Sequence, residues 1–230
     1  MTTDFIYKKL ISYQDLKYKK FISTLLPTVD SETIIGVRMP VLRKLAKEII
    51  ISDEVSVEKF LSTLPHKYYE ENILHMLIIS SYKDLDKVLN ELDIFLPYAD
   101  NWAVSDCQVP KIFKNHPKEV SNKVKAWIAS DKTYTIRYGI LILMHLFLDE
   151  NYNKDYLYII ADKKSDEYYV NMMRAWFFQE ALVKQYDDAV KVIEDKYMDK
   201  WTHNKAIQKA IESRKISKGT KDYLRSLKIK

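Results

Sequence analysis

Glycine is scarce in this sequence, and that scarcity restricts the fold more than any other feature. Only 3 glycines occur among 230 residues, where average usage of roughly 7% would give about 16. Hairpins and bulges use glycine because it reaches positive φ angles without steric cost. A chain this poor in glycine is therefore not expected to contain β-sheets, and we expect an all-α protein.

Apolar residues recur with helical spacing along almost the whole chain, and no segment shows sustained period-two alternation. The length is sufficient to bury a core without a disulfide or a metal. No low-complexity linker splits the chain, and we therefore predict a single domain over residues 1–230. The spacing predicts helices over 14–26, 40–51, 56–63, 68–81, 84–97, 102–114, 117–129, 133–148, 152–162, 167–185, 187–197, 201–213 and 217–227.

The predicted helices form pairs that repeat at a nearly constant interval. The first helices of successive pairs begin near Tyr68, Trp102, Thr133, Glu167 and Trp201, at steps of about 34, 31, 34 and 34 residues. This length is typical of two-helix repeats. Such repeats stack into a curved α-α superhelix with one concave face. A globular helix bundle without repeats is the alternative.

Several classes of protein are excluded by the number and spacing of the cysteine and histidine residues and by the lengths of the apolar segments. The single Cys107 excludes a disulfide framework, and it is expected to be a buried thiol rather than a nucleophile. No Cys/His cluster has metal-ligand spacing, and no cofactor fingerprint occurs. Neither a membrane span nor an apolar signal core is found. We expect a cytoplasmic monomer without metal or cofactor.

Positive charge is concentrated at the end of the chain. Residues 200–230, the last predicted helix pair, carry ten Lys or Arg against two acidic residues, a net +8 within a chain of net +5. The remaining residues therefore sum to −3. This asymmetry favours a polyanionic partner such as nucleic acid. A solvated, lysine-rich final helix explains it equally well.

Three of the predicted first helices carry residues suited to chemistry. Trp102 and Asp106 are four apart on one helix, Arg137 lies early in an apolar helix, and Trp176 lies near Arg174. Like positions on successive repeats would converge on the concave face. Two indoles, a carboxylate and a guanidinium suit a sugar, a cation and a phosphate. Alternatively, the tryptophans belong to the core and Asp106 is a surface charge.

The order of Trp102, Asp106, Arg137 and Trp176 along the chain resembles that of the AlkD-like DNA alkylation repair family. Three other segments carry the same resemblance: GVRMPVLR at 36–43, HKYYEEN at 66–72 and NKAIQKAIESR at 204–214. The likeness extends over nearly the whole chain. It implies HEAT-like repeats stacked into a solenoid.

The resemblance also implies an activity. Members of this family include monofunctional DNA glycosylases, which hydrolyse the N-glycosidic bond of cationic N3- and N7-alkylated purines in duplex DNA without a base-flipping pocket. By this likeness Asp106 would be the catalytic carboxylate, Trp102 and Trp176 would pack on the sugar–phosphate of the lesion, and Arg137 would contact the backbone. Further DNA contacts are expected from Arg38, Arg43, Arg174, Lys205, Lys209 and Arg214.

Two other functions remain open on the sequence. One is a DNA-binding helical-repeat protein that excises nothing, and the other is a protein–protein scaffold in which both tryptophans are core residues. The order of the four candidate residues favours the glycosylase over the scaffold. It does not separate the glycosylase from a DNA-binding protein without activity.

Overall fold

The structure, a computed structural model, describes residues 2–52 and 56–230. Over these residues the chain is helical, with no strand, and no described helix is long and apolar enough to cross a membrane. The all-α class is therefore confirmed. The chain divides into two compact units, residues 1–115 and 116–230, and each is described by itself. The single domain predicted over 1–230 stays a prediction.

Unit 1 is organised around α5, which contacts α3, α6 and α7. All eleven residues of α5 are buried, because neighbouring helices cover it on several sides. Its helices are α1 (Thr2–Ser12), α2 (Leu16–Leu25), α3 (Met39–Ile51), α4 (Val57–Ser62), α5 (Tyr69–Ile79), α6 (Leu85–Phe95) and α7 (Trp102–Ser105), with 3₁₀ turns at Ser31–Thr33, Leu96–Tyr98 and Lys111–Asn115.

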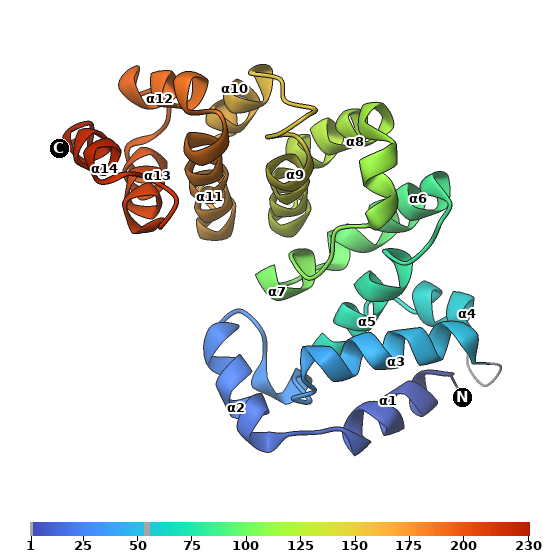
Figure 1. Cartoon of the computed structure of the whole chain (residues 1–230). Helices are drawn as coiled ribbons and strands as arrows, with labels where there is room; N and C mark the ends of the chain where they lie inside the picture. The colour runs from blue at the N-terminus through green and yellow to red at the C-terminus, as the bar shows by residue number, and fades with distance from the viewer. Residues whose placement is uncertain (1, 53–55) are drawn as a thin grey trace. The chain divides into compact units, whose positions relative to one another are not determined.

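Unit 2 consists of stacked helix pairs. Helices α9, α11 and α13 pack side by side in one row, while α10 and α12, above that row in Figure 1, contact each other and α11. The helices are α8 (Pro117–Ala129), α9 (Thr133–Leu146), α10 (Asp155–Asp162), α11 (Tyr168–Lys184), α12 (Tyr186–Glu194), α13 (Lys200–Glu212) and α14 (Lys218–Ser226). This arrangement agrees with a helical-repeat solenoid.

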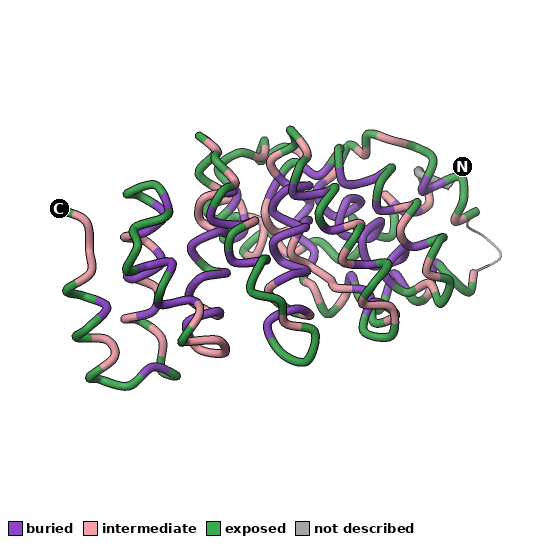
Figure 2. The backbone as a smooth tube through the Cα atoms, turned by 90° about the horizontal axis from the view of Figure 1, so that it is seen from above, coloured by how far each residue is buried: buried purple, intermediate pink, exposed green. Residues whose placement is uncertain are grey.

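The number of buried residues in a helix depends on how many neighbouring helices pack against it. Every residue of α9 from Tyr134 to Leu143 is buried, because α8 packs on one side of the helix and α11 on another. Gly139 permits the close approach of α8, since a Cβ atom there would lie 2.9 Å from Ile128 Cγ1. On outer helices buried and exposed residues alternate along the backbone (Figure 2).

The predicted repeat starts agree closely with the structure. Thr133 and Trp102 are the first residues of α9 and α7, and the other three starts differ by one residue from α5, α11 and α13. Two predictions were incomplete or wrong. Helix α1 was not predicted, and the helix predicted over 102–114 ends at Ser105. Pro110 explains why no helix runs through to residue 114, because proline has no N–H for the Asp106 carbonyl and its ring clashes with that carbonyl.

A buried glutamate joins two of the segments on which the family resemblance rests. The Glu70 side chain on α5 is 0% exposed and accepts backbone N–H groups from Ile35, Gly36 and Val37 at 2.9, 2.6 and 3.1 Å. Gly36 has a φ of +98°, and a Cβ atom there would lie 2.6 Å from Lys19 Cβ. Only glycine fits this turn. The first and second segments therefore meet in a structural contact that leads the chain into α3.

Unit 1 also contains a buried histidine pair. His66 Nε2 and His75 Nδ1 are 2.9 Å apart, and the two rings stack on Phe60 and Phe95 respectively. Burial lowers the pKa of His66 to about 4. Burial, together with the charge of His66, lowers the pKa of His75 further. Both rings are therefore neutral in the folded protein at neutral pH.

We expect the protein to lose stability in mild acid because of this pair. In the unfolded chain both histidines bind protons below their ordinary pKa of about 6.5, whereas the folded rings stay neutral. Their contribution is complete above that pH and declines as the pH falls toward 4. The free energy of unfolding should drop by roughly 2–4 kcal/mol between pH 7 and pH 5. Denaturant titrations of wild type, His75→Leu and His116→Gln would measure it. Only His75→Leu should flatten the pH dependence.

Candidate functional site

Helix α7 positions Trp102 and Asp106. Asn101 caps it: its Oδ1 accepts the Val104 N–H at 3.1 Å, and the residue is 0% exposed. Asp106 follows the last helical residue with backbone angles that are still helical, and its N–H bonds to the Trp102 carbonyl at 2.9 Å. The two side chains therefore lie one helical turn apart, as predicted, although the helix itself is short.

Both side chains are half-buried and held in place. The Trp102 indole Nε1 donates to the Leu25 carbonyl, at the end of α2, at 3.1 Å. Asp106 Oδ1 accepts a hydrogen bond from Ser105 Oγ at 3.0 Å. A carboxylate held beside an indole and still partly open to solvent can stabilise a nearby positive charge or orient a water molecule.

The segment after Asp106 is anchored by Arg43 of α3. Its guanidinium donates to Gln108 Oε1 at 2.6 Å and to the Cys107 carbonyl at 3.2 Å. Burial raises the pKa of the Cys107 thiol to about 12, so the sulfur is protonated at neutral pH. Cys107 therefore lacks the thiolate that a nucleophile needs.

In unit 2, Trp176 of α11 is flanked by two cations. The indole is 39% exposed, with Lys209 Nζ 4.5 Å and Arg137 Cζ 6.0 Å from its ring centroids. Burial lowers the pKa of Lys209, as do the charges of Lys205 and Arg137, while Glu212 acts against them. Burial is the main cause, and an anion such as a phosphate next to Lys209 would favour its charged form again.

Arg137 itself is largely enclosed. It is 3% exposed, and its Nη1 donates to the Tyr169 carbonyl at 2.9 Å. The side chain is enclosed because it lies on the buried helix α9. A residue that contacts the DNA backbone would be expected to be more exposed. The predicted contact between Arg137 and DNA stays a prediction, as does the prediction that Trp102, Asp106, Arg137 and Trp176 share one concave surface.

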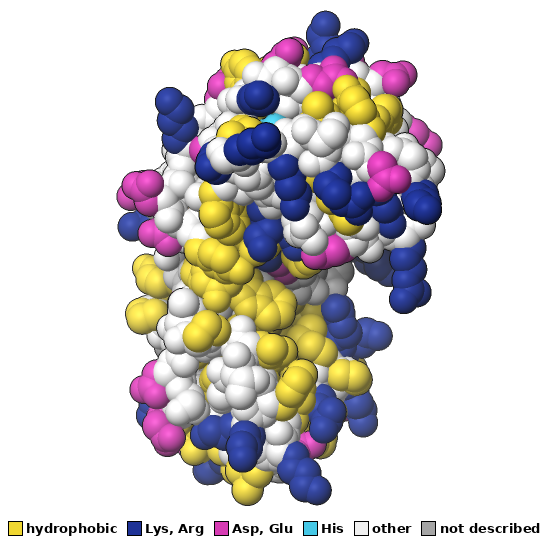
Figure 3. Space-filling view, turned by 90° about the vertical axis from the view of Figure 1, so that its left-hand side faces the viewer, with side chains coloured by type: hydrophobic (Ala, Val, Ile, Leu, Met, Phe, Trp, Pro, Cys, Tyr) yellow, Lys and Arg dark blue, Asp and Glu magenta, His cyan; other side chains and the backbone are white. Residues whose placement is uncertain are grey.

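Four of the other predicted DNA contacts lie at the surface. Arg38, Arg43 and Arg214 are exposed, and Lys205 is half-buried. Arg38 Nε and Nη2 both donate to Asp15 Oδ2, at 3.0 and 2.9 Å, while Lys205 Nζ lies 5.7 Å from the Trp201 ring. Figure 3 shows Lys and Arg side chains gathered over the surface in the upper part of the view, where α13 and α14 lie.

Arg174 is the exception, and its predicted DNA contact is corrected. The side chain is 1% exposed, and all three of its nitrogens donate hydrogen bonds inside unit 2. It ties the end of α10 to the start of α13 through α11. Its acceptors lie 2.8–3.1 Å away and are the carbonyls of Ile160 and Ala161 and the side chains of Asn171, Asp199 and Thr202.

Sequence reasoning missed Trp201 as a functional candidate and used it only to mark a repeat. The indole is 42% exposed, and Lys205 lies over it from the next turn of α13. A Trp and a Lys four residues apart in a basic helix are the signal that could have found it. No group of three or more His, Cys, Asp or Glu in the described part of the chain could hold a metal ion.

Together these features define a helical-repeat protein whose surface combines exposed indoles with lysine and arginine, as nucleic-acid-binding proteins do. The family model of the DNA alkylation repair enzymes matches residues 6–212. The chain therefore belongs to this family, and it acts in the repair of alkylated DNA. No curated protein matches the chain significantly in sequence.

Proposed function

We propose that the protein is a monofunctional DNA glycosylase that removes cationic N3- and N7-alkylated purines from duplex DNA. The observation that supports this best is the Asp106 carboxylate, held by Ser105 one helical turn from Trp102 and partly open to solvent. Because the chain belongs to a family of DNA alkylation repair enzymes, this carboxylate is a candidate for the catalytic group of a repair reaction. The enzyme acts as a monomer, without metal or cofactor.

The reaction needs little from the protein because the lesion is already charged. The bond between C1′ and the purine nitrogen breaks, and its electron pair neutralises the positive charge of the base. The sugar becomes an oxocarbenium-like cation, which the Asp106 carboxylate stabilises. Water then adds to C1′ and gives up a proton, leaving an abasic site and a neutral alkylpurine. A general acid is not required, and the base need not enter a pocket.

Trp102 and Trp176 would assist this reaction by stabilising positive charge. An indole beside a cationic sugar or base contributes roughly 0.5–2 kcal/mol of cation–π stabilisation. Trp102 is fixed by its bond to Leu25, so its ring does not have to be ordered on binding. Trp176 lies beside Lys209, whose charge suits a DNA phosphate.

The charge of the lesion provides the test of this proposal. Wild-type protein should release N7-methylguanine from duplex DNA and should release a neutral lesion such as hypoxanthine more than about tenfold more slowly, because nothing protonates the neutral leaving group. Chromatography of the released bases measures both rates. Equal rates would contradict the mechanism. Binding without release of either base would identify a DNA-binding protein that does not excise bases.

A further inference from the structure

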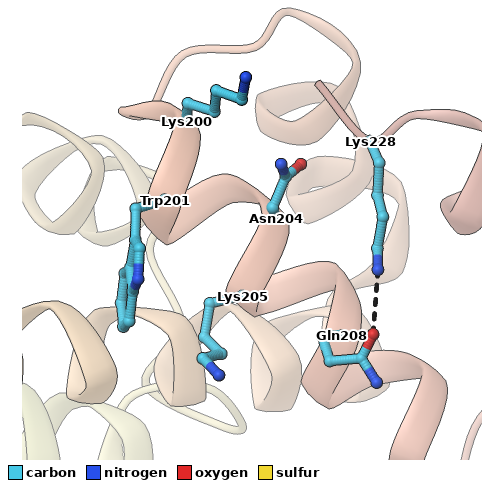
Figure 4. Close-up of a pocket in the computed structure, with 6 residues that line it drawn as sticks. All are labelled: Lys200, Trp201, Asn204, Lys205, Gln208 and Lys228. Atoms are coloured by element: carbon cyan, nitrogen blue, oxygen red, sulfur yellow. Dashed lines mark hydrogen bonds between the residues drawn. The ribbon is translucent and has the colours of Figure 1, made fainter. Parts of the chain in front are cut away.

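An open pocket that the proposed chemistry does not use lies between α13 and the residues after α14 in unit 2. It has a volume of about 490 Å³ and opens on α13 beside the final segment of the chain (Figure 4). This volume lies in the range of small-molecule sites, about 300–1,000 Å³. Its lining is made by Lys200, Trp201, Asn204, Lys205, Gln208 and Lys228.

The pocket walls are held by hydrogen bonds and are therefore in place before a ligand binds. The Asn204 amide pairs with Ile229 through two bonds, one to its carbonyl and one from its N–H, both 2.9 Å. His203 Nε2 lies 2.9 Å from the Leu227 carbonyl. These contacts fasten the segment that carries Lys228 against α13.

The lining of the pocket is positively charged. None of its lining residues is acidic. Lys228 Nζ donates to the amide oxygen of Gln208 at 2.9 Å, and Lys200 Nζ donates to the backbone oxygen of Lys230 at 2.6 Å. Within the described residues, no ion pair joins Lys200, Lys205 or Lys228 to a carboxylate side chain. An anion is the ligand that this charge favours.

Trp201 adds an aromatic surface to the same pocket. Its indole is held at an angle against Tyr168 of α11, with ring centroids 5.8 Å apart, and is 42% exposed. Lys205 and Lys209 are one turn apart on α13, about 6 Å along the helix axis, and each lies over an indole, Trp201 and Trp176 respectively. The pocket thus continues the row of cations and aromatic rings that begins at Trp176.

We propose that this pocket binds a phosphodiester group of the DNA strand beyond the lesion, with Trp201 packed on the adjoining deoxyribose. The inference rests on the proposed function, because it extends the surface around Trp176 along the same strand. It assigns a DNA contact to Lys200, Trp201 and Lys228. Continuity with Trp176 favours a polymeric ligand over a free anion.

The test uses undamaged duplex, so that it does not depend on excision. The double variant Lys200→Gln/Lys228→Gln should bind roughly 5–25-fold more weakly than wild type. The slope of log affinity against log salt concentration should fall by about 2, since each lysine that no longer neutralises a phosphate removes roughly 0.9. Trp201→Leu should weaken binding several-fold and leave the slope unchanged, because it removes no charge. Lys191→Gln, an exposed lysine on α12, is the matched control and should bind as wild type does.

The possible outcomes separate this inference from the proposed function. Affinity and salt slope at wild-type values in both pocket variants would overturn the pocket assignment, whatever the excision activity. Tight binding of inorganic phosphate or deoxyadenosine monophosphate that duplex DNA does not displace would also overturn it, in favour of a free anion. Absence of base release by wild type would contradict only the glycosylase. If wild type does release bases, the pocket variants should raise KM and leave kcat unchanged.

Discussion

Replacing Asp106 with asparagine is expected to lower the rate of release of N7-methylguanine from duplex DNA by roughly 10–1,000-fold. Asparagine keeps the shape of the side chain and can still accept the Ser105 hydrogen bond, but it removes the negative charge that stabilises the cationic sugar. The loss should appear in single-turnover rates, which report the chemical step. Affinity for undamaged duplex should stay the same or increase slightly, because a negative charge leaves a surface that faces phosphates.

Asp86→Asn supplies the matched control for this variant. Asp86 is an exposed residue in the first turn of α6, so its substitution makes the same change in charge and volume away from α7. Its rate of base release should equal that of wild type. The mechanism would be refuted if Asp106→Asn released bases as fast as wild type, even though the fold and the family would stand.

Replacing Arg174 with methionine should destabilise the protein by about 2–5 kcal/mol, because each buried carbonyl left without a donor costs roughly 1–3 kcal/mol. Methionine fills much of the volume but donates no hydrogen bond, so the carbonyls of Ile160 and Ala161 lose their partner and Asp199 loses its ion pair. Denaturant or thermal unfolding, followed by circular dichroism, measures the loss.

The same variant decides whether Arg174 is structural or contacts DNA. Under conditions where Arg174→Met is folded, the salt dependence of its DNA binding should equal that of wild type. Arg214→Gln, at an exposed arginine just after α13, should leave stability unchanged. An Arg174→Met protein of normal stability, but with a smaller salt slope, would restore the DNA contact predicted from the sequence.

The Trp102–Asp106 pair could be predicted because it depends on local geometry. Residues four apart meet on a helix, and they meet here although the helix ends at Ser105, since the backbone of Asp106 still completes the turn. The pocket beside α13 could not be predicted in the same way. Lys228 reaches it because Asn204 and His203 hold the last residues of the chain against the helix.

The sequence by itself determined the fold class and the repeats. Helical periodicity and the near absence of glycine are local properties, so they predicted the starts of α7 and α9 to the residue. Only the tertiary structure decided what each charged side chain does. Arg174 and Arg38 both looked like DNA contacts, yet one is buried among carbonyls from another helix and the other is exposed. Burial depends on which helices pack together, and a sequence pattern within one helix does not contain that information.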